Sequence, residues 1–188
     1  IEVLNALGVV NGLEAADVVV ADAKGKETRA HVTAIPIPQG PHGNEIIPPN
    51  WIDMVAPTSA PPLWRKDPDQ LFTTDYVPAS SLVYANFRAV VNAEKETVEQ
   101  FGERVIQLAN DKKARAIVID VRTNNGGNNF LGRAFFESIL KSNYNDDGRL
   151  FVITGRETFS ACQNFCNWLD RQTAAIFVGG TTGSRAKL

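Results

Sequence analysis

The second half of the chain alternates short apolar runs with amphipathic stretches, and this alternation constrains the fold most. No proline occurs after Pro78, so no proline interrupts regular structure there. Continuous apolar runs predict buried strands, and apolar residues spaced three or four apart predict helices. The expected strands span 82–87, 114–121, 150–154 and 174–178, and the expected helices span 97–110, 130–140 and 160–171. The order predicts an α/β fold: a mostly parallel sheet with right-handed βαβ crossovers and helices on its faces.

The first 81 residues have a different character. Residues 17–22 and 28–35 are typical of two strands of a hairpin joined by a short turn. All ten prolines lie between Pro36 and Pro78, which predicts a long irregular connector. The connector also contains large apolar residues, namely Trp51, Met54, Trp64, Leu71 and Phe72. We therefore expect it to wrap over the domain that follows, unlike a solvated linker rich in glycine and serine.

Composition excludes several classes of protein. The formal net charge of −2 argues against a dedicated nucleic-acid binder, and no apolar run is long enough to span a membrane. The chain starts at Ile1 and shows no signal sequence, so we expect a processed or excised piece of a longer protein. Cys162 and Cys166 lie four residues apart on an expected helix, with no other cysteine or histidine near them in the sequence. We expect buried thiols there, and neither a disulfide, a metal site nor any other cofactor is predicted.

A glycine-rich loop follows the strand expected at 114–121. Gly126 and Gly127 allow the backbone to approach a ligand closely and to turn N–H groups toward it. Phosphate binding is one interpretation, but neither nucleotide-binding glycine pattern is present and the loop has no lysine. Binding of the oxyanion formed in acyl transfer is the other interpretation. Asp120 and Arg122 flank the loop, and we expect them to hold it in place through side-chain bonds.

A serine lies where the strand expected at 150–154 gives way to a helix. The hydroxyl of Ser160 faces unpaired backbone N–H groups and the positive end of the helix dipole. Thr158 or Ser160 can act simply as a helix N-cap, or Ser160 can act as a nucleophile. The segment from Thr158 to Cys162 lacks the glycines of the G-x-S-x-G elbow, which argues against the α/β-hydrolase fold.

Three motifs occur in the order and at the separations of a known peptidase family. Residues 117–127 read IVIDVRTNNGG, residues 158–165 read TFSACQNF, and residues 178–182 read VGGTT. Together they resemble the tail-specific, or C-terminal-processing, serine peptidases, whose core is related to the Clp protease and crotonase folds. The arrangement is most similar to the histidine-using branch of that family.

The resemblance implies a division of the chain into three parts. Residues 82–188 correspond to the peptidase core, truncated at its C-terminal end. Residues 1–35 correspond to a remnant of a small PDZ-like domain, and residues 36–81 form the proline-rich connector. The family also implies an extracytoplasmic or secreted location and a peptide or protein substrate.

The resemblance further implies a serine peptidase that acts through an acyl-enzyme on Ser160. The backbone N–H groups of Ala161 and of Gly126 or Gly127 match the oxyanion hole. The general base is unmatched. In the lysine-using branch of the family it lies 25 residues after the serine, and that position is Arg185 here, which stays protonated.

No other residue of the chain matches the base. Asn86 stands where one arrangement of the histidine branch has its base. His31 on a strand face and His42 in the connector are weak candidates, because a catalytic histidine needs an orienting partner and a rigid mount. We therefore expect the base and its orienting acid to lie outside this piece, which is then inactive alone.

Two other functions fit parts of the pattern. One is a catalytically inactive relative that binds a peptide or hydrophobic ligand in the same cleft. The other is a crotonase-like acyl-thioester enzyme, which needs a carboxylate over the acyl site, and no residue can be named for that role.

Overall fold

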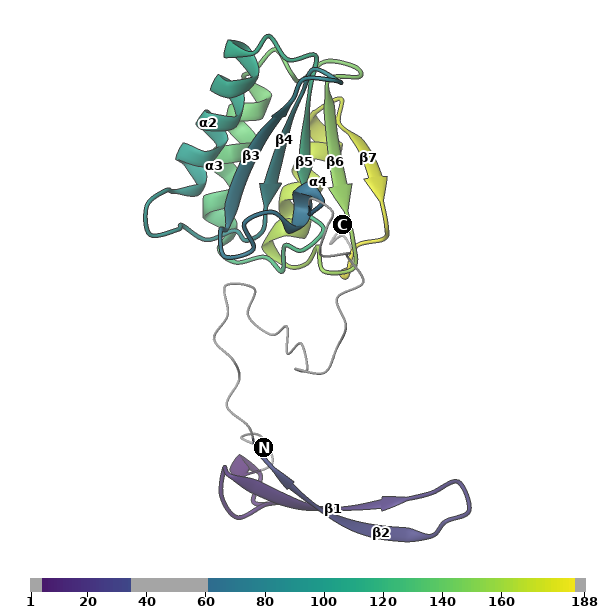
Figure 1. The fold of residues 1–188 in the computed structure, drawn as a ribbon. Helices are drawn as coiled ribbons and strands as arrows, with labels where there is room; N and C mark the ends of the chain where they lie inside the picture. The colour runs from purple at the N-terminus through teal and green to yellow at the C-terminus, as the bar shows by residue number, and fades with distance from the viewer. Residues whose placement is uncertain (1–4, 35–60, 185–188) are drawn as a thin grey trace. The chain divides into compact units, whose positions relative to one another are not determined.

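The computed structural model describes residues 5–34 and 61–184, which belong to two compact units (Figure 1). The first unit contains the antiparallel hairpin of β1 (Ala15–Ala21) and β2 (Glu27–Thr33). In the turn, the carboxylate of Asp22 accepts the backbone N–H groups of Lys24 and Lys26. The predicted hairpin is confirmed, and its likeness to a PDZ domain stays a prediction.

The second unit is built on a five-stranded sheet in the order β3-β4-β5-β6-β7. Its strands are β3 (Phe72–Val77), β4 (Leu82–Phe87), β5 (Ala116–Asp120), β6 (Leu150–Thr154) and β7 (Ile176–Gly179). The connecting helices are α2 (Val98–Asp111), α3 (Asn129–Leu140) and α4 (Ala161–Gln172). The pairs from β4 to β7 are parallel, and only β3 is antiparallel to its neighbour. The predicted α/β fold with a mostly parallel sheet and βαβ crossovers is confirmed.

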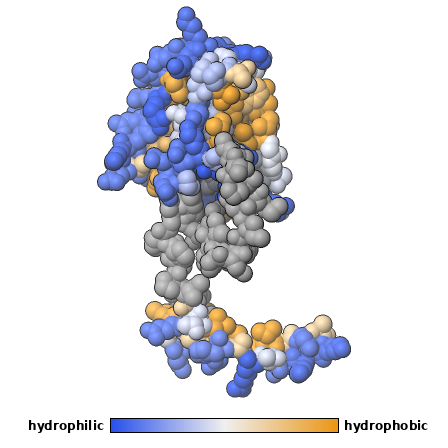
Figure 2. All heavy atoms as spheres, in the orientation of Figure 1, coloured by the Kyte–Doolittle hydropathy of each residue, from blue (hydrophilic) through white to orange (hydrophobic). Residues whose placement is uncertain are grey.

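The three helices cover one face of the sheet, although the sequence predicted helices on its faces (Figure 1). The parallel strands lie in sequence order, so each right-handed crossover returns on the same side. The opposite face carries half-buried Val118, Phe151 and Ile153, next to exposed Ile176 and Val178 on the edge strand β7. Figure 2 shows hydrophobic residues gathered on this side of the unit.

Phenylalanine rings fill the space between the sheet and the helices. The cluster consists of Phe72, Phe87, Phe101, Phe135 and Phe165, all buried. The closest ring centroids, those of Phe72 and Phe101, lie 4.7 Å apart in a stacked arrangement. This cluster joins β3, β4 and all three helices into one core, so it fixes the positions of the loops at the carboxyl ends of the strands.

None of the described helices is both long enough and apolar enough to cross a membrane.

Strand β3 lies inside the range that the sequence assigned to the connector. Its polar residues Thr73, Thr74 and Asp75 interrupt the apolar run that would have predicted a strand, and Pro78 follows directly after the strand. A strand beside a proline is tolerated at the edge of a sheet, which is where β3 lies.

The buried Arg88 anchors the segment before β3. Its guanidinium donates to the backbone carbonyls of Trp64, Lys66, Asp67 and Gln70. These bonds satisfy a charge that is only 4% exposed, and burial lowers the pKa of Arg88. The described end of the predicted connector therefore packs on the second unit, as expected.

Candidate functional site

Two loops from neighbouring strands meet at the carboxyl end of the sheet. Residues 121–128 follow β5 and residues 155–160 follow β6, and these strands pair in parallel. A Cβ built on Gly126 would lie 2.8 Å from the Cβ of Ser160 and 2.9 Å from the backbone nitrogen of Ala161. The structure therefore brings Gly126, Ser160 and Ala161 together at the carboxyl ends of β5 and β6.

Ser160 has an unusual backbone conformation. It occupies the N-cap position of α4 with φ 53° and ψ −121°, yet its side chain makes no capping hydrogen bond. A residue with a Cβ in this region is strained by about 1–3 kcal/mol. The side chain is exposed. This backbone conformation leaves the Ser160 hydroxyl free at the start of α4. A nucleophile elbow positions its serine in a similar way, although the glycines of that elbow are absent here.

Thr158 holds the turn that leads to Ser160. Its hydroxyl donates to the carbonyl of Val121 at 2.8 Å and accepts the N–H of Gly155 at 3.0 Å. The side chain is fully buried. Thr158 therefore does not cap α4 but ties the loop after β6 to the end of β5.

Asn124 joins the two loops to the sheet and is fully buried. Its amide donates to the carbonyl of Phe87 at 2.9 Å, and its Oδ1 accepts the N–H of Gly126 at 2.9 Å. Its backbone carbonyl accepts the N–H of Phe159 at 3.0 Å. The sequence contained Asn124 within a motif but did not indicate this role, which depends on contacts 35 or more residues apart along the chain.

Two backbone N–H groups of these loops lack a hydrogen-bond acceptor among the described residues. Among the described residues, the N–H groups of Gly127 and Ala161 donate to no acceptor, whereas that of Gly126 is bonded to Asn124. Gly127 has φ 140°, and a Cβ there would overlap the carbonyl oxygen of Val90 at 2.3 Å. Ala161 opens α4, where the helix dipole favours negative charge.

Asp120 and Arg122, at the start of the loop after β5, bond to each other and, through Asp120, to Tyr84. The buried carboxylate of Asp120 accepts from Arg122 Nη2 at 2.6 Å and from the Tyr84 hydroxyl at 2.5 Å. Burial and the bond to Asp120 raise the pKa of Tyr84, and the same carboxylate raises the pKa of Arg122. The expectation that Asp120 and Arg122 hold the loop by side-chain bonds is confirmed.

The described residues place no histidine near these loops, and the candidate position 86 holds an asparagine. Asn86 is buried, and its amide donates to the carbonyl of Trp64 at 3.1 Å. Lys66 contacts Asp75 at 2.5 Å, and this bond raises the pKa of Lys66, so the amine stays protonated. Residues 61–184 contain no histidine.

Of the weak candidates for the base, the structure describes His31 alone. His31 belongs to the first unit, where its exposed ring lies 2.8 Å from the carboxylate of Asp17. His42 and Arg185 lie outside the described residues. Neither histidine is part of the loops around Ser160 in the second unit.

The two cysteines are buried free thiols, as expected. Burial raises the pKa of Cys162 well above its usual value, so its thiol stays neutral. Within residues 5–34 and 61–184, no group of three histidine, cysteine or acidic side chains is arranged to hold a metal ion.

No family model and no curated protein matches this sequence. A solved structure from Parabacteroides merdae, described as a peptidase, shares 15% identity and a TM-score of 0.49, over 61% of this chain and 44% of that one. The photosystem II D1 C-terminal processing protease shares 12% identity and a TM-score of 0.49, over 96% of this chain and 47% of that one. A structure from Bacteroides fragilis, described as an S41 protease, shares 10% identity and a TM-score of 0.46, over 96% of this chain and 51% of that one.

All three neighbours are described as peptidases or proteases, and one of them as a C-terminal processing protease. This chain spans about half of the length of each of them, between 44% and 51%.

Proposed function

We propose that the chain contains the nucleophile-bearing core of a serine peptidase that cleaves peptide bonds through an acyl-enzyme on Ser160. The observation that carries the proposal is the strained, exposed and uncapped Ser160 beside Gly126. Strained backbone of this kind persists where neighbouring contacts impose it, and it is concentrated at active sites. Here Thr158 and Asn124 supply those contacts.

In this proposal the hydroxyl oxygen of Ser160 attacks the carbonyl carbon of the scissile peptide bond. The carbonyl oxygen becomes an oxyanion, which the N–H groups of Ala161 and Gly127 bind. Gly126 is the weaker donor candidate, because its N–H already bonds to Asn124. Preorganised donors at a helix N-terminus stabilise such an anion without rearrangement. The amine is then expelled, and water hydrolyses the ester on Ser160.

The base that accepts the proton of Ser160 lies outside residues 61–184 in this proposal. Those residues contain no histidine, and Lys66 is held protonated by Asp75. A serine hydroxyl without an adjacent base is a weak nucleophile near neutral pH. We therefore infer that the 188-residue piece is inactive alone and that a full-length protein supplies the base and its orienting acid.

Proteolysis by the full-length protein tests this function. Ser160→Ala should lower the rate of cleavage of an unstructured protein substrate at least about 1,000-fold. Ser81→Ala is the matched control, because Ser81 shares the positive φ of 53° but lies in the turn before β4. If Ser160→Ala cleaves at the wild-type rate, the proposal is wrong.

A catalytically inactive binding protein is the second candidate function. The observation that favours it is Asn86, which stands at the position of a possible base and is buried in a bond to Trp64. Such a relative would bind a peptide or hydrophobic ligand in the same cleft. It predicts that the full-length protein binds unstructured peptides but leaves them intact.

A further inference from the structure

The chain contains two asparagine–glycine pairs, Asn11-Gly12 and Asn125-Gly126. Asparagine followed by glycine is prone to spontaneous deamidation, because glycine has no side chain to hinder attack on the asparagine amide and leaves the backbone free to bend. The second pair lies in the loop beside Ser160, so its chemical stability matters for the candidate site.

Deamidation of such a pair is an intramolecular reaction. The backbone nitrogen of the glycine loses its proton and bonds to the side-chain carbonyl carbon of the asparagine. The bond from that carbon to the amide nitrogen breaks, and ammonia leaves with the proton. Water then opens the cyclic imide at either carbonyl, which gives aspartate or isoaspartate. The reaction therefore requires a glycine N–H that is free and a backbone that can close the ring.

Asn11 and Gly12 meet both requirements. The two residues are exposed and lie in the irregular segment before β1. The N–H of Gly12 donates to no acceptor among the described residues. Apart from its chain neighbours, no atom lies within 4 Å of a Cβ built on Gly12. The backbone can therefore reach the geometry of attack without breaking a hydrogen bond of Gly12.

Asn125 is also exposed, but the glycine that follows it is held from both sides. The N–H of Gly126 donates to Asn124 Oδ1 at 2.9 Å, and its carbonyl accepts the N–H of Val90 at 2.8 Å. A Cβ built on Gly126 would lie 2.8 Å from the carbonyl oxygen of Phe159, so the glycine is closely packed. Ring closure at Asn125 requires the bond to Asn124 to break inside this packed loop, which is costly for a buried group.

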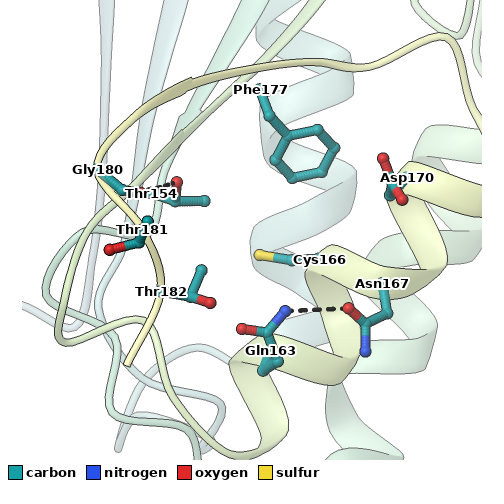
Figure 3. A pocket seen from close by; sticks show the side chains of 9 residues that line it. All are labelled: Thr154, Gln163, Cys166, Asn167, Asp170, Phe177, Gly180, Thr181 and Thr182. Carbon is teal, nitrogen blue, oxygen red and sulfur yellow. Dashed lines mark hydrogen bonds between the residues drawn. The ribbon is translucent and has the colours of Figure 1, made fainter. Parts of the chain in front are cut away.

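Asn167 provides an internal standard for an unreactive asparagine. It is followed by Trp168 within α4, where the hydrogen bonds of the helix hold the backbone N–H groups. Its Oδ1 also accepts from Gln163 Nε2 at 3.0 Å (Figure 3). Neither the bulky neighbour nor the helical backbone allows the ring to close.

We propose that Asn11 is a site of spontaneous deamidation and that the bond from Gly126 to Asn124 protects Asn125 from the same reaction. The modification adds a negative charge, and its isoaspartate form also inserts a carbon atom into the main chain. At Asn11 these changes fall in an exposed segment of the first unit. At Asn125 they would distort the loop beside Ser160. The inference holds whether or not Ser160 is a nucleophile.

Peptide mass spectrometry of the folded 188-residue chain after incubation in mildly alkaline buffer tests the proposal. Digestion at acidic pH prevents deamidation during the digestion itself. Asn11 should deamidate at least about tenfold faster than Asn125, because Gly126 must first open locally, and Asn167 should stay intact. In concentrated urea Asn11 and Asn125 should react at similar rates. Equal rates in the folded chain, an intact Asn11, or the same difference in urea would overturn the proposal.

Two variants separate the bond to Asn124 from overall stability. Asn124→Ala should raise the rate at Asn125 at least about fivefold, the factor that one ordinary hydrogen bond contributes, and should leave Asn11 unchanged. Val105→Ala is the matched control, because Val105 is fully buried on α2 and its loss destabilises the core without touching this bond. Thermal unfolding verifies that both variants are folded during the incubation. An unchanged rate in Asn124→Ala, or equal acceleration by both variants, would contradict the protective role of Asn124.

Discussion

At the scale of single residues, the proposed function rests on the backbone conformation of Ser160. An ordinary N-cap serine is extended and bonds to its own helix, whereas Ser160 has φ 53° and makes no such bond. Its neighbours are fixed by the bonds of Thr158 and Asn124 to other segments. The fold therefore maintains a conformation that the residue itself disfavours.

Replacement of Ser160 by glycine should relieve this strain. We expect Ser160→Gly to have a free energy of unfolding about 1 kcal/mol higher than Ser160→Ala, because only glycine adopts this φ without a Cβ clash. Urea denaturation of both variants measures the difference. A lower stability of Ser160→Gly than of Ser160→Ala would contradict backbone strain at position 160.

Position 126 requires glycine because it has no room for a Cβ and because its φ is 103°. Gly126→Ala would place a methyl group 2.8 Å from the Cβ of Ser160, so we expect a loss of about 2–4 kcal/mol in stability. The matched control is Gly148→Ala, which also has a positive φ but no atom within 4 Å of the new methyl group. Thermal unfolding should show a clearly smaller loss for Gly148→Ala, and equal losses would contradict the close contact.

The buried thiol of Cys162 should make stability depend on alkaline pH. Burial raises its pKa in the folded state, so above about pH 8.5 only the unfolded state loses this proton. The stabilisation that comes from keeping this thiol neutral is fully present below that pH. It declines as the pH rises, so the free energy of unfolding falls by about 1 kcal/mol between pH 8.5 and 9.5. Urea denaturation at these two pH values should show a smaller decline in Cys162→Ala. Parallel declines would contradict the raised pKa.

At the scale of elements, Asn124 connects the loop after β5 to β4 and to the loop after β6. Asn124→Ala leaves the buried N–H of Gly126 and the buried carbonyl of Phe87 without these partners. We expect a loss of about 2–4 kcal/mol in the free energy of unfolding. Asn110→Ala, at an exposed position on α2, should change stability by less than about 0.5 kcal/mol. Similar effects of both changes in urea denaturation would argue against the role of Asn124.

The sequence predicted most of the elements because apolar runs and helical spacing are local signals. The strands from β4 to β7 and the helices α2 to α4 lie within two residues of their expected bounds. Strand β3 was missed because its polar residues resemble a loop and its pairing with β4 is a tertiary contact. The motifs indicated Ser160, Ala161, and Gly126 or Gly127 for the site.

Other features of the site could not be read from the sequence. The φ of Ser160, the bond that occupies the N–H of Gly126, and the carbonyl cluster around Arg88 all depend on segments far apart in the chain. Local patterns carry no information on such contacts.

At the scale of the whole molecule, the second unit holds Ser160 and its neighbouring N–H groups in one folded body. The described residues of this unit contain no histidine, and the proposal assigns the base to another part of a longer protein. In this proposal activity requires the full-length molecule, whereas the stability of the folded unit can be measured on this chain.

Labelling of the full-length protein with a fluorophosphonate tests the central claim most directly. The reagent forms a phosphonyl ester with an activated serine oxygen and releases fluoride. Peptide mass spectrometry should locate the adduct on Ser160, and Ser160→Ala should abolish it while Ser81→Ala keeps it. An adduct on another serine, or no adduct on the folded full-length protein, would contradict the assignment of Ser160 as the nucleophile.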